Sequence, residues 1–337
     1  MSIRVSVVMP VFNGERFLRK AIDSILVQTF SDFEFIIVDD GSTDGTGEII
    51  NSYRDPRIML VRNEHRMGRG KARNRVIGLA IADYVAIQDA DDVSLSTRLE
   101  RQLAYMEANP RVGVLGTWIR LVDENESMIS EWHTHERHEM IAWSNLFSTA
   151  LAHPSIMYRR KIVVDAGGYL LDEAEDFDLW SRLAAETRFA NLPEIFVLYR
   201  QHKNAGVVVL SSLVTERTEQ ILQRVNSSLL GRTVTLHEAG CLNKSLSGHA
   251  LNSAADVLST YSLIQQIMNA YLSKQDLGVS DVHWVRHDAA RRLAILADAN
   301  RHCFPEEAKK IMVQSIRMWR RLLRSRQALR VFLGINL

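Results

Sequence analysis

Residues 5–44, VSVVMPVFNGERFLRKAIDSILVQTFSDFEFIIVDDGSTD, contain in succession the patterns of a strand, a helix and a second strand. Val5–Met9 is a β-branched run that Pro10 ends, and Glu15–Thr29 has apolar residues at helical spacing. Glu34–Val38 is again apolar and is followed by an Asp-Gly turn signal. This spacing predicts a β-α-β unit, in which a helix joins two parallel strands.

The same alternation of strands and helices continues to residue 87. Further helices are predicted over Ser42–Ser52 and Arg69–Ala82, and further strands over Arg57–Val61 and Tyr84–Ile87. Strands that are apolar throughout are typical of a parallel sheet covered by helices on both faces. We therefore expect an α/β, Rossmann-like fold with a mostly parallel sheet, whose ligands bind beyond the carboxyl ends of the strands.

The next part of the chain mixes strand and helix patterns. A helix over Ser96–Ala108 and a strand over Val112–Thr117 precede a polar region, residues 118–138, which suits a β excursion with a loop. Strands are then predicted over Ser155–Tyr158 and Ile195–Tyr199, with a helix over Phe177–Ala185 between them.

Beyond residue 210 strand signals nearly vanish. The elements predicted there are all helices, over Ser211–Leu230, Ser247–Leu272, Ser280–Asn300 and Glu306–Leu333. We therefore expect two domains, an α/β domain over residues 1–210 and a helical region over residues 211–337.

The composition argues against several classes of protein. Lys and Arg total 41 and Asp and Glu total 40, so the net charge is +1 and nucleic acid is not an expected partner. Cys241 and Cys303 lie far apart without a C-x-x-C pattern, so neither a disulfide framework nor a zinc site is expected. Because no secretory signal and no long uncharged apolar run is visible, we expect a cytoplasmic protein that at most attaches to a membrane surface.

The sharpest local signal is Asp89-Ala90-Asp91-Asp92, directly after an apolar strand. Alternate side chains of an extended chain point the same way, so we expect Asp89 and Asp91 to present two carboxylates to one object. Mg²⁺ or Mn²⁺ would relieve the repulsion between them and also bind substrate phosphates. The alternative is a solvated acidic loop that caps the next helix.

Two further polar clusters come before predicted helices. The acidic pair in Asp39–Asp44 can accept hydrogen bonds from a nucleobase or a ribose, although the same residues also suit a tight turn. In Gly68–Asn74, glycines precede a basic helix start and can approach a diphosphate closely. The spacing matches neither a Walker loop nor a GxGxxG motif, so an ATPase and a nicotinamide dehydrogenase are disfavoured.

Two later segments are ambiguous when taken alone. Glu173–Arg182 is an acidic loop that enters a helix, where carboxylates often only complement the helix dipole. Tyr199–His202 follows a strand, and a single histidine in such a place is more often structural than functional.

Taken in order, these clusters resemble the inverting glycosyltransferase family 2, which has the GT-A fold. The resemblance covers residues 3–205 and also includes Val5–Gly14 and Ser24–Phe30. Each motif is weak alone, but seven of them in the family's order are specific. The resemblance implies that residues 1–210 form a GT-A catalytic domain that binds a nucleotide-sugar.

The resemblance also implies roles at the donor site. Asp40 would contact the nucleobase, in a pocket lined by Pro10 and Phe12. Asp89 would lie by the ribose or by the water shell of the metal. The full set implied to bind the nucleotide-sugar is Pro10, Phe12, Asn13, Asp40, Arg73 and Asp89.

The same resemblance implies a metal site and a general base. Asp91 would ligate a Mn²⁺ or Mg²⁺ ion that bridges the diphosphate, and His202 would complete the metal site. Asp176 would take the proton from the acceptor hydroxyl, with Glu175 as its rival for that role. A positioned base typically contributes about 10²–10⁴-fold to the rate.

These roles predict an enzyme that moves a sugar from a nucleotide-diphosphate sugar, with UDP as the expected carrier, onto a glycan or lipid-linked acceptor. The expected setting is the assembly of bacterial surface polysaccharide or glycolipid. Two alternatives stay open. One is a sugar nucleotidyltransferase, whose glycine-rich first loop is missing here, and the other is a non-catalytic carbohydrate-binding protein on the same fold.

Residues 309–333 carry many Lys and Arg residues and no Asp or Glu. At helical spacing one face holds Met312, Ile316, Trp319 and Leu323, which is typical of a helix that lies on a membrane. This pattern predicts peripheral contact with the inner face of the membrane. The alternative is a terminal helix that packs on the protein with its basic face in solvent, and a homo-oligomer also stays open.

Overall fold

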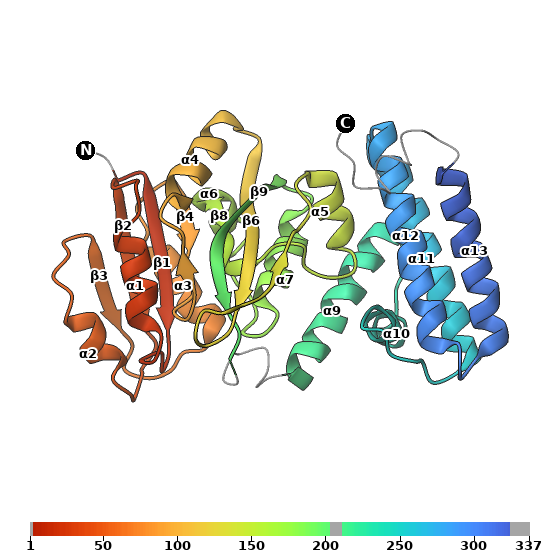
Figure 1. The fold of residues 1–337 in the computed structure, drawn as a ribbon, viewed down its shortest axis with the longest axis horizontal. Coiled ribbons are helices and arrows are strands. Elements are labelled where there is room, and N and C mark those ends of the chain that lie inside the picture. Colours follow the sequence, from red (N-terminus) through yellow and green to blue (C-terminus); the bar gives the residue numbers. More distant parts are fainter. Residues whose placement is uncertain (1–2, 203–210, 324–337) are drawn as a thin grey trace. The chain divides into compact units, whose positions relative to one another are not determined.

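The computed structural model describes residues 3–202 and 211–323 (Figure 1). The described chain forms two compact units. The first holds residues 3–141, 149–202 and 211–214, and the second holds residues 142–148 and 215–323. The short segment 142–148 therefore belongs to the second unit, although the chain on both sides of it belongs to the first.

The first unit is built on one mixed sheet with the strand order β3-β2-β1-β4-β8-β6-β9-β5, and β7 pairs with β6 outside this path. Strands β3, β2, β1 and β4 are parallel to one another, β8 is antiparallel to both β4 and β6, and β9 is parallel to β6. The strands are β1 Val5–Val11, β2 Phe33–Asp39, β3 Ile58–Arg62, β4 Tyr84–Ile87, β5 Val93–Ser94, β6 Val112–Val122, β7 Met128–Trp132, β8 Met157–Arg159 and β9 Arg188–Arg200. The predicted α/β class is confirmed.

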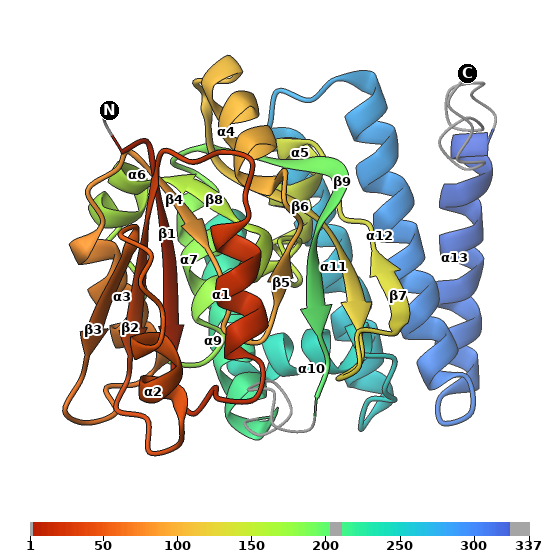
Figure 2. The same cartoon turned by 60° about the vertical axis from the view of Figure 1, so that its left-hand side comes forward.

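Helices cover both faces of this sheet. Alternate residues of β1 and β2 enter two different cores, because successive side chains of a strand point to opposite faces. Helix α1 packs on one face, and α3 and α7 pack on the other (Figure 2). The helices of the unit are α1 Leu18–Leu26, α2 Thr46–Asn51, α3 Arg69–Leu79, α4 Arg98–Ala108, α6 Arg160–Asp165 and α7 Glu175–Leu183, with a 3₁₀ turn η1 at His153–Ser155 and α5 His138–Ser144 crossing into the second unit.

Several predicted boundaries were wrong for identifiable reasons. Helix α2 begins at Thr46 instead of at Ser42, because the carboxylates of Asp39 and Asp44 accept backbone N–H groups and hold the turn between them. Strand β9 begins at Arg188, well before the predicted Ile195, because a shift in its pairing with β6 accommodates Pro193. A bulge of this kind lets a strand continue past a proline.

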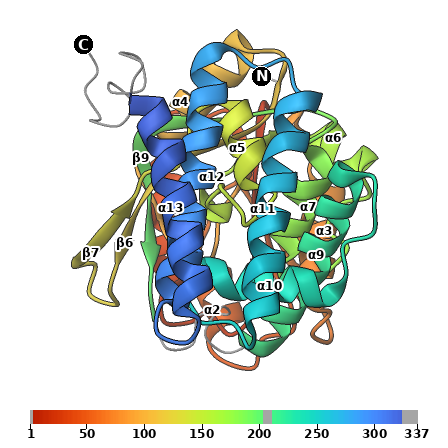
Figure 3. The same cartoon turned by 90° about the vertical axis from the view of Figure 1, so that its right-hand side faces the viewer.

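The second unit is a helical bundle. Helices α11, α12 and α13 run side by side, with α10 beside them (Figure 3). Trp143 of the segment 142–148 is buried in this core and donates a hydrogen bond from Nε1 to Asp288 Oδ2 over 2.7 Å. The helices are α9 Ser211–Leu230, which starts in the first unit, α10 Leu236–Leu246, α11 Ala254–Lys274, α12 Val279–Asn300 and α13 Pro305–Leu323.

The helix predicted over Ser247–Leu272 corresponds to α11, but its start was predicted seven residues too early, and α10 was not predicted. Helix α10 ends earlier in a Schellman motif, in which Gly248 has φ +74° and its N–H and that of His249 bond to carbonyls of the last turn. Helix α11 then starts afresh, since the side chain of Ser253 accepts the N–H of Asp256.

Part of the α13 face that was predicted to meet a membrane packs against the second unit instead. The ring of Trp319 stacks on His287 with 4.8 Å between centroids, and Met312 packs against the core of the unit, whereas Ile316 is exposed. The predicted face extends beyond the described residues, which include neither the side chain of Leu323 nor residues 324–333. Among the described helices, none combines the length and apolar character that crossing a bilayer requires.

Candidate active site

The candidate site lies where β1, β2 and β4 end, because the carboxyl ends of parallel strands meet at one edge of the sheet. The first two polar clusters interlock there. Asn13, which has φ +50°, donates its backbone N–H to Ser42 Oγ, and its Oδ1 accepts the backbone N–H of Thr43, each over 2.9 Å. Pro10, which was predicted to end the first strand, lies within β1, which continues to Val11, and the half-exposed ring of Phe12 carries the Arg66 guanidinium 4.3 Å from its centroid.

Asp40 is buried at the end of β2 and anchors the loop before α3. Its Oδ1 accepts hydrogen bonds from Asn63 Nδ2 at 2.6 Å and Met67 N at 2.9 Å, and its Oδ2 accepts from Gly68 N at 3.1 Å. A carboxylate offers about four lone-pair positions, so this anchoring still leaves one for a ligand.

The two carboxylates after β4 belong to a turn, whereas the sequence had suggested an extended chain. Ala90 and Asp91 form this turn, in which Asp92 N donates to Asp89 O over 3.3 Å. Asp89 Oδ1 lies 3.6 Å from Arg73 Nη2, and Asp91 Oδ2 lies 2.9 Å from His202 Nε2. The two side chains therefore have different partners, and the premise of an extended chain was wrong.

Arg73 is the centre of a buried charge network. Its Nη2 lies 3.2 Å from Glu175 Oε1, and its Nη1 lies 2.6 Å from the ring of His153. His153 Nε2 in turn lies 2.9 Å from Tyr169 Oη. Arg73 and Glu175 were predicted from the sequence, whereas His153 and Tyr169 were not, because no spacing in the chain links them to the acidic clusters.

The network shifts the ionisation of its members. Burial alone would raise the pKa of Asp89, but the Arg73 guanidinium outweighs it and holds that pKa well below the ordinary value. Burial raises the pKa of Glu175, which Arg73 opposes and Asp176 reinforces. Burial and Arg73 lower the pKa of His153, so its imidazole is neutral near pH 7.

Asp176 and Glu175 stand in the first turn of α7 but have different surroundings. Glu175 is buried and paired with Arg73, whereas Asp176 is partly exposed and accepts only the backbone N–H of Phe177 at 2.7 Å, among the hydrogen bonds described. Burial raises the pKa of Asp176 as well. The arrangement leaves Asp176 as the carboxylate that is free to exchange a proton with a ligand.

Asp91 and His202 form the part of the site that can hold a metal ion. Two ligand atoms at right angles around an octahedral ion, each about 2.1 Å away, lie about 3.0 Å apart. The observed 2.9 Å between Asp91 Oδ2 and His202 Nε2 fits that separation. Arg200 is buried and donates a hydrogen bond from Nε to the carbonyl of Asp91 over 2.9 Å, which holds the backbone of Asp91 in place.

Tyr199 stands near the end of β9, directly before Arg200. Burial raises the pKa of its phenol, and the charges of Asp92, Asp89, Asp91 and Asp176 raise it further. The first three of these carboxylates follow β4 and Asp176 lies in α7, so negative charge from both segments acts on this side chain. The arrangement can accept a polyphosphate with its cation and a hydroxyl to be deprotonated.

Comparison with known proteins is consistent with this geometry. The sequence profile described as glycosyl transferase family 2 matches residues 6–166. The O-antigen biosynthesis glycosyltransferase WbnJ of Escherichia coli is 34% identical over 219 residues, which cover 61% of this chain and 84% of that protein.

Solved structures show the same fold. The Staphylococcus aureus protein TarS, residues 1–349 in complex with UDP-GlcNAc, has a TM-score of 0.58 at 18% identity and covers 93% of this chain and 91% of that one. The mannosyltransferase PcManGT of Pyrobaculum calidifontis, in complex with GDP-Man and Mn²⁺, has a TM-score of 0.53 at 18% identity, with coverage of 94% and 88%.

Proposed function

The chain belongs to glycosyltransferase family 2, and from this premise we propose that it transfers a sugar, with inversion, from a UDP-linked donor to an acceptor hydroxyl. The observation that carries the proposal is the pair Asp91–His202 at 2.9 Å, with Asp176 directly after Glu175, which shares Arg73 with Asp89. The UDP-GlcNAc and GDP-Man complexes of the two structural relatives support a nucleotide-sugar donor.

The donor is bound by the ends of β1, β2 and β4. Pro10, Phe12 and Asn13 line the nucleobase side, where Asp40 has one lone-pair position left. Asp89, kept ionised by Arg73, faces the ribose. In this proposal Arg73 acts mainly as the buried cation that orients Asp89 and Glu175.

Asp91 and His202 would hold Mn²⁺ or Mg²⁺, which neutralises the charge that develops on the leaving diphosphate. The Mn²⁺ in the structure of PcManGT supports this assignment. Asp176 removes the proton of the acceptor hydroxyl while the hydroxyl oxygen attacks the anomeric carbon. The bond from that carbon to the diphosphate oxygen breaks in the same step. A single displacement of this kind inverts the anomeric centre.

The acceptor is a glycan or lipid-linked saccharide in this proposal. The role of WbnJ in O-antigen biosynthesis supports a surface polysaccharide as the product. Peripheral membrane contact through α13 would then bring the enzyme to its acceptor, with Lys309, Lys310 and Arg317 on the exposed side of the helix.

The decisive experiment offers the purified enzyme a series of UDP-sugars and GDP-sugars with Mn²⁺ and a lipid-diphosphate-linked saccharide. We expect one UDP-sugar to release UDP and to add one sugar to the acceptor, with inverted configuration in the NMR spectrum. Retention of configuration would contradict the mechanism, and formation of a nucleotide-sugar when a sugar phosphate and UTP replace the donor would identify a nucleotidyltransferase instead.

A further inference from the structure

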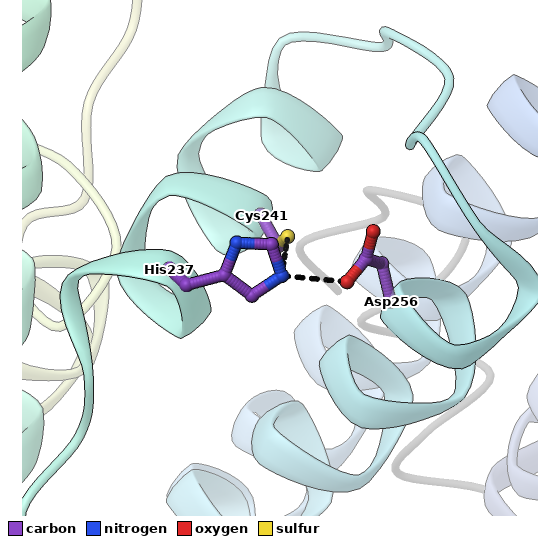
Figure 4. Close-up of side chains that lie close together, drawn as sticks. All are labelled: His237, Cys241 and Asp256. Carbon is purple, nitrogen blue, oxygen red and sulfur yellow. Dashed lines mark hydrogen bonds and ion pairs between the residues drawn. The ribbon is translucent and has the colours of Figure 1, made fainter.

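Three side chains with metal-binding atoms meet in the second unit, in a place that the glycosyltransferase chemistry does not use (Figure 4). His237 Nε2 lies 2.6 Å from Asp256 Oδ1 and 3.7 Å from Cys241 Sγ. All three ligand atoms lie within 4.8 Å of one another.

Two capped helices hold these side chains. His237 and Cys241 are four residues apart on α10 and therefore share one face of it. Asp256 lies in the first turn of α11. The capping box of Thr235 fixes the start of α10, and Ser253 fixes the start of α11. The positions of the three groups are thus set by local structure.

The arrangement does not suit a nucleophile with its base. A Cys-His-Asp relay needs the thiol on one ring nitrogen and the carboxylate on the other. Here both partners approach the same atom, His237 Nε2. In addition, burial and the charge of Asp256 raise the pKa of the Cys241 thiol to about 11, so it is protonated at neutral pH.

Three ligand atoms of different kinds that lie within 4.8 Å of one another suit a cation. Around a tetrahedral Zn²⁺ ion, nitrogen and oxygen ligands lie about 3.3 Å apart and nitrogen and sulfur ligands about 3.6 Å apart. The observed 3.7 Å between Sγ and Nε2 matches, whereas Asp256 has to withdraw from its 2.6 Å hydrogen bond to His237. His237 is largely exposed, so its ring can adjust.

A neighbouring cavity gives access to the three side chains. Its volume is about 490 Å³, and His237, Cys241, Glu219 and His249 are among its lining residues. The carboxylate of Glu219 lies beside Gly240, the residue before Cys241, and its charge acts on the thiol. Water from this cavity can take the fourth position on the ion.

We propose that His237, Cys241 and Asp256 bind Zn²⁺ and thereby fasten α10 to α11. Binding replaces the thiol proton by a zinc–sulfur bond and releases that proton to solvent. The sequence did not indicate a zinc site, because its ligands follow no C-x-x-C spacing and one of them is an aspartate on the next helix.

The test uses the full chain with Asp91→Ala, which removes the candidate catalytic metal site, and titrates it with Co²⁺ and Zn²⁺ after chelation. We expect one ion per chain, a thiolate-to-cobalt charge-transfer band in the near ultraviolet, and release of one proton. Adding Cys241→Ser abolishes the band and weakens Zn²⁺ binding at least tenfold, whereas Cys303→Ser, the matched control, leaves both unchanged.

Three results would overturn the proposal. They are no charge-transfer band in the chain that carries Asp91→Ala, a band that survives Cys241→Ser, and Zn²⁺ binding that His237→Ala leaves unchanged. The first needs no substitution among the three proposed ligands, so damage to the new site cannot explain it.

Discussion

Asp176 and Glu175 are adjacent carboxylates that differ in burial and in their partners, so we expect them to have different roles. Glu175 is buried against Arg73, whereas Asp176 is partly exposed and has no cation within ion-pair distance among the described residues. We predict that Asp176→Asn lowers kcat by about 10²–10⁴-fold and leaves the donor Kd unchanged. Glu175→Gln is the comparison variant, and we expect it chiefly to lower the free energy of unfolding. Full turnover by Asp176→Asn would move the base elsewhere.

The raised pKa of Asp176 has a consequence for the pH profile. The base must be ionised to act, so kcat should rise with pH as Asp176 loses its proton. Because burial raises this pKa, we expect the midpoint of the acidic limb to lie above about 3.9, the ordinary value for aspartate. A kcat profile measured at saturating donor, with Asp176→Glu for comparison, checks this; an identical limb in both would count against it.

Asp91 and His202 should govern metal-dependent donor binding. We predict that UDP with Mn²⁺ raises the Tm of the wild-type chain, since a ligand that binds only the folded state stabilises it. Asp91→Ala should remove that rise and leave any Mn²⁺-independent effect of UDP. An unchanged Tm shift in this variant would contradict the assignment of the metal site.

At the scale of single elements, the end of α10 offers a clean test of backbone strain. Gly248 has φ +74° and no atom would lie within 4 Å of an added Cβ, so Gly248→Ala meets strain but no clash. We expect it to lower the free energy of unfolding by about 1–2 kcal/mol. At Gly78 in α3 an added Cβ would also have no atom within 4 Å, so Gly78→Ala should instead raise the free energy of unfolding by up to about 1 kcal/mol. Urea unfolding monitored by circular dichroism measures both.

Helix α13 tests the proposed membrane contact. Reversal of Lys309, Lys310 and Arg317 to Glu should weaken binding to anionic vesicles by about 3 kcal/mol, or more than 100-fold, because each basic residue contributes about 1 kcal/mol. A control with the same change of charge is Arg54→Glu, Arg111→Glu and Lys161→Glu on exposed positions of the first unit. Equal vesicle sedimentation of both variants would remove α13 from the mechanism.

At the scale of the whole molecule, the sequence predicted what local periodicity determines. The alternation from Val5 to Ile87 indicated the parallel part of the sheet and the edge at which its polar clusters meet. It could not predict the turn at Ala90, which sends Asp89 and Asp91 to different partners, because that turn depends on contacts made by β9. His153 joins Arg73 only through the folded chain, so no spacing could reveal it.

The segment 142–148 is synthesised before the core that buries it. Trp143 and Phe147 leave the ribosome long before Asp288 and the rest of that core. Until those later helices have been synthesised, both aromatic rings of the nascent chain are exposed to solvent, where chaperones and proteases can reach them. Translation that stops near residue 210 should therefore yield an aggregation-prone product.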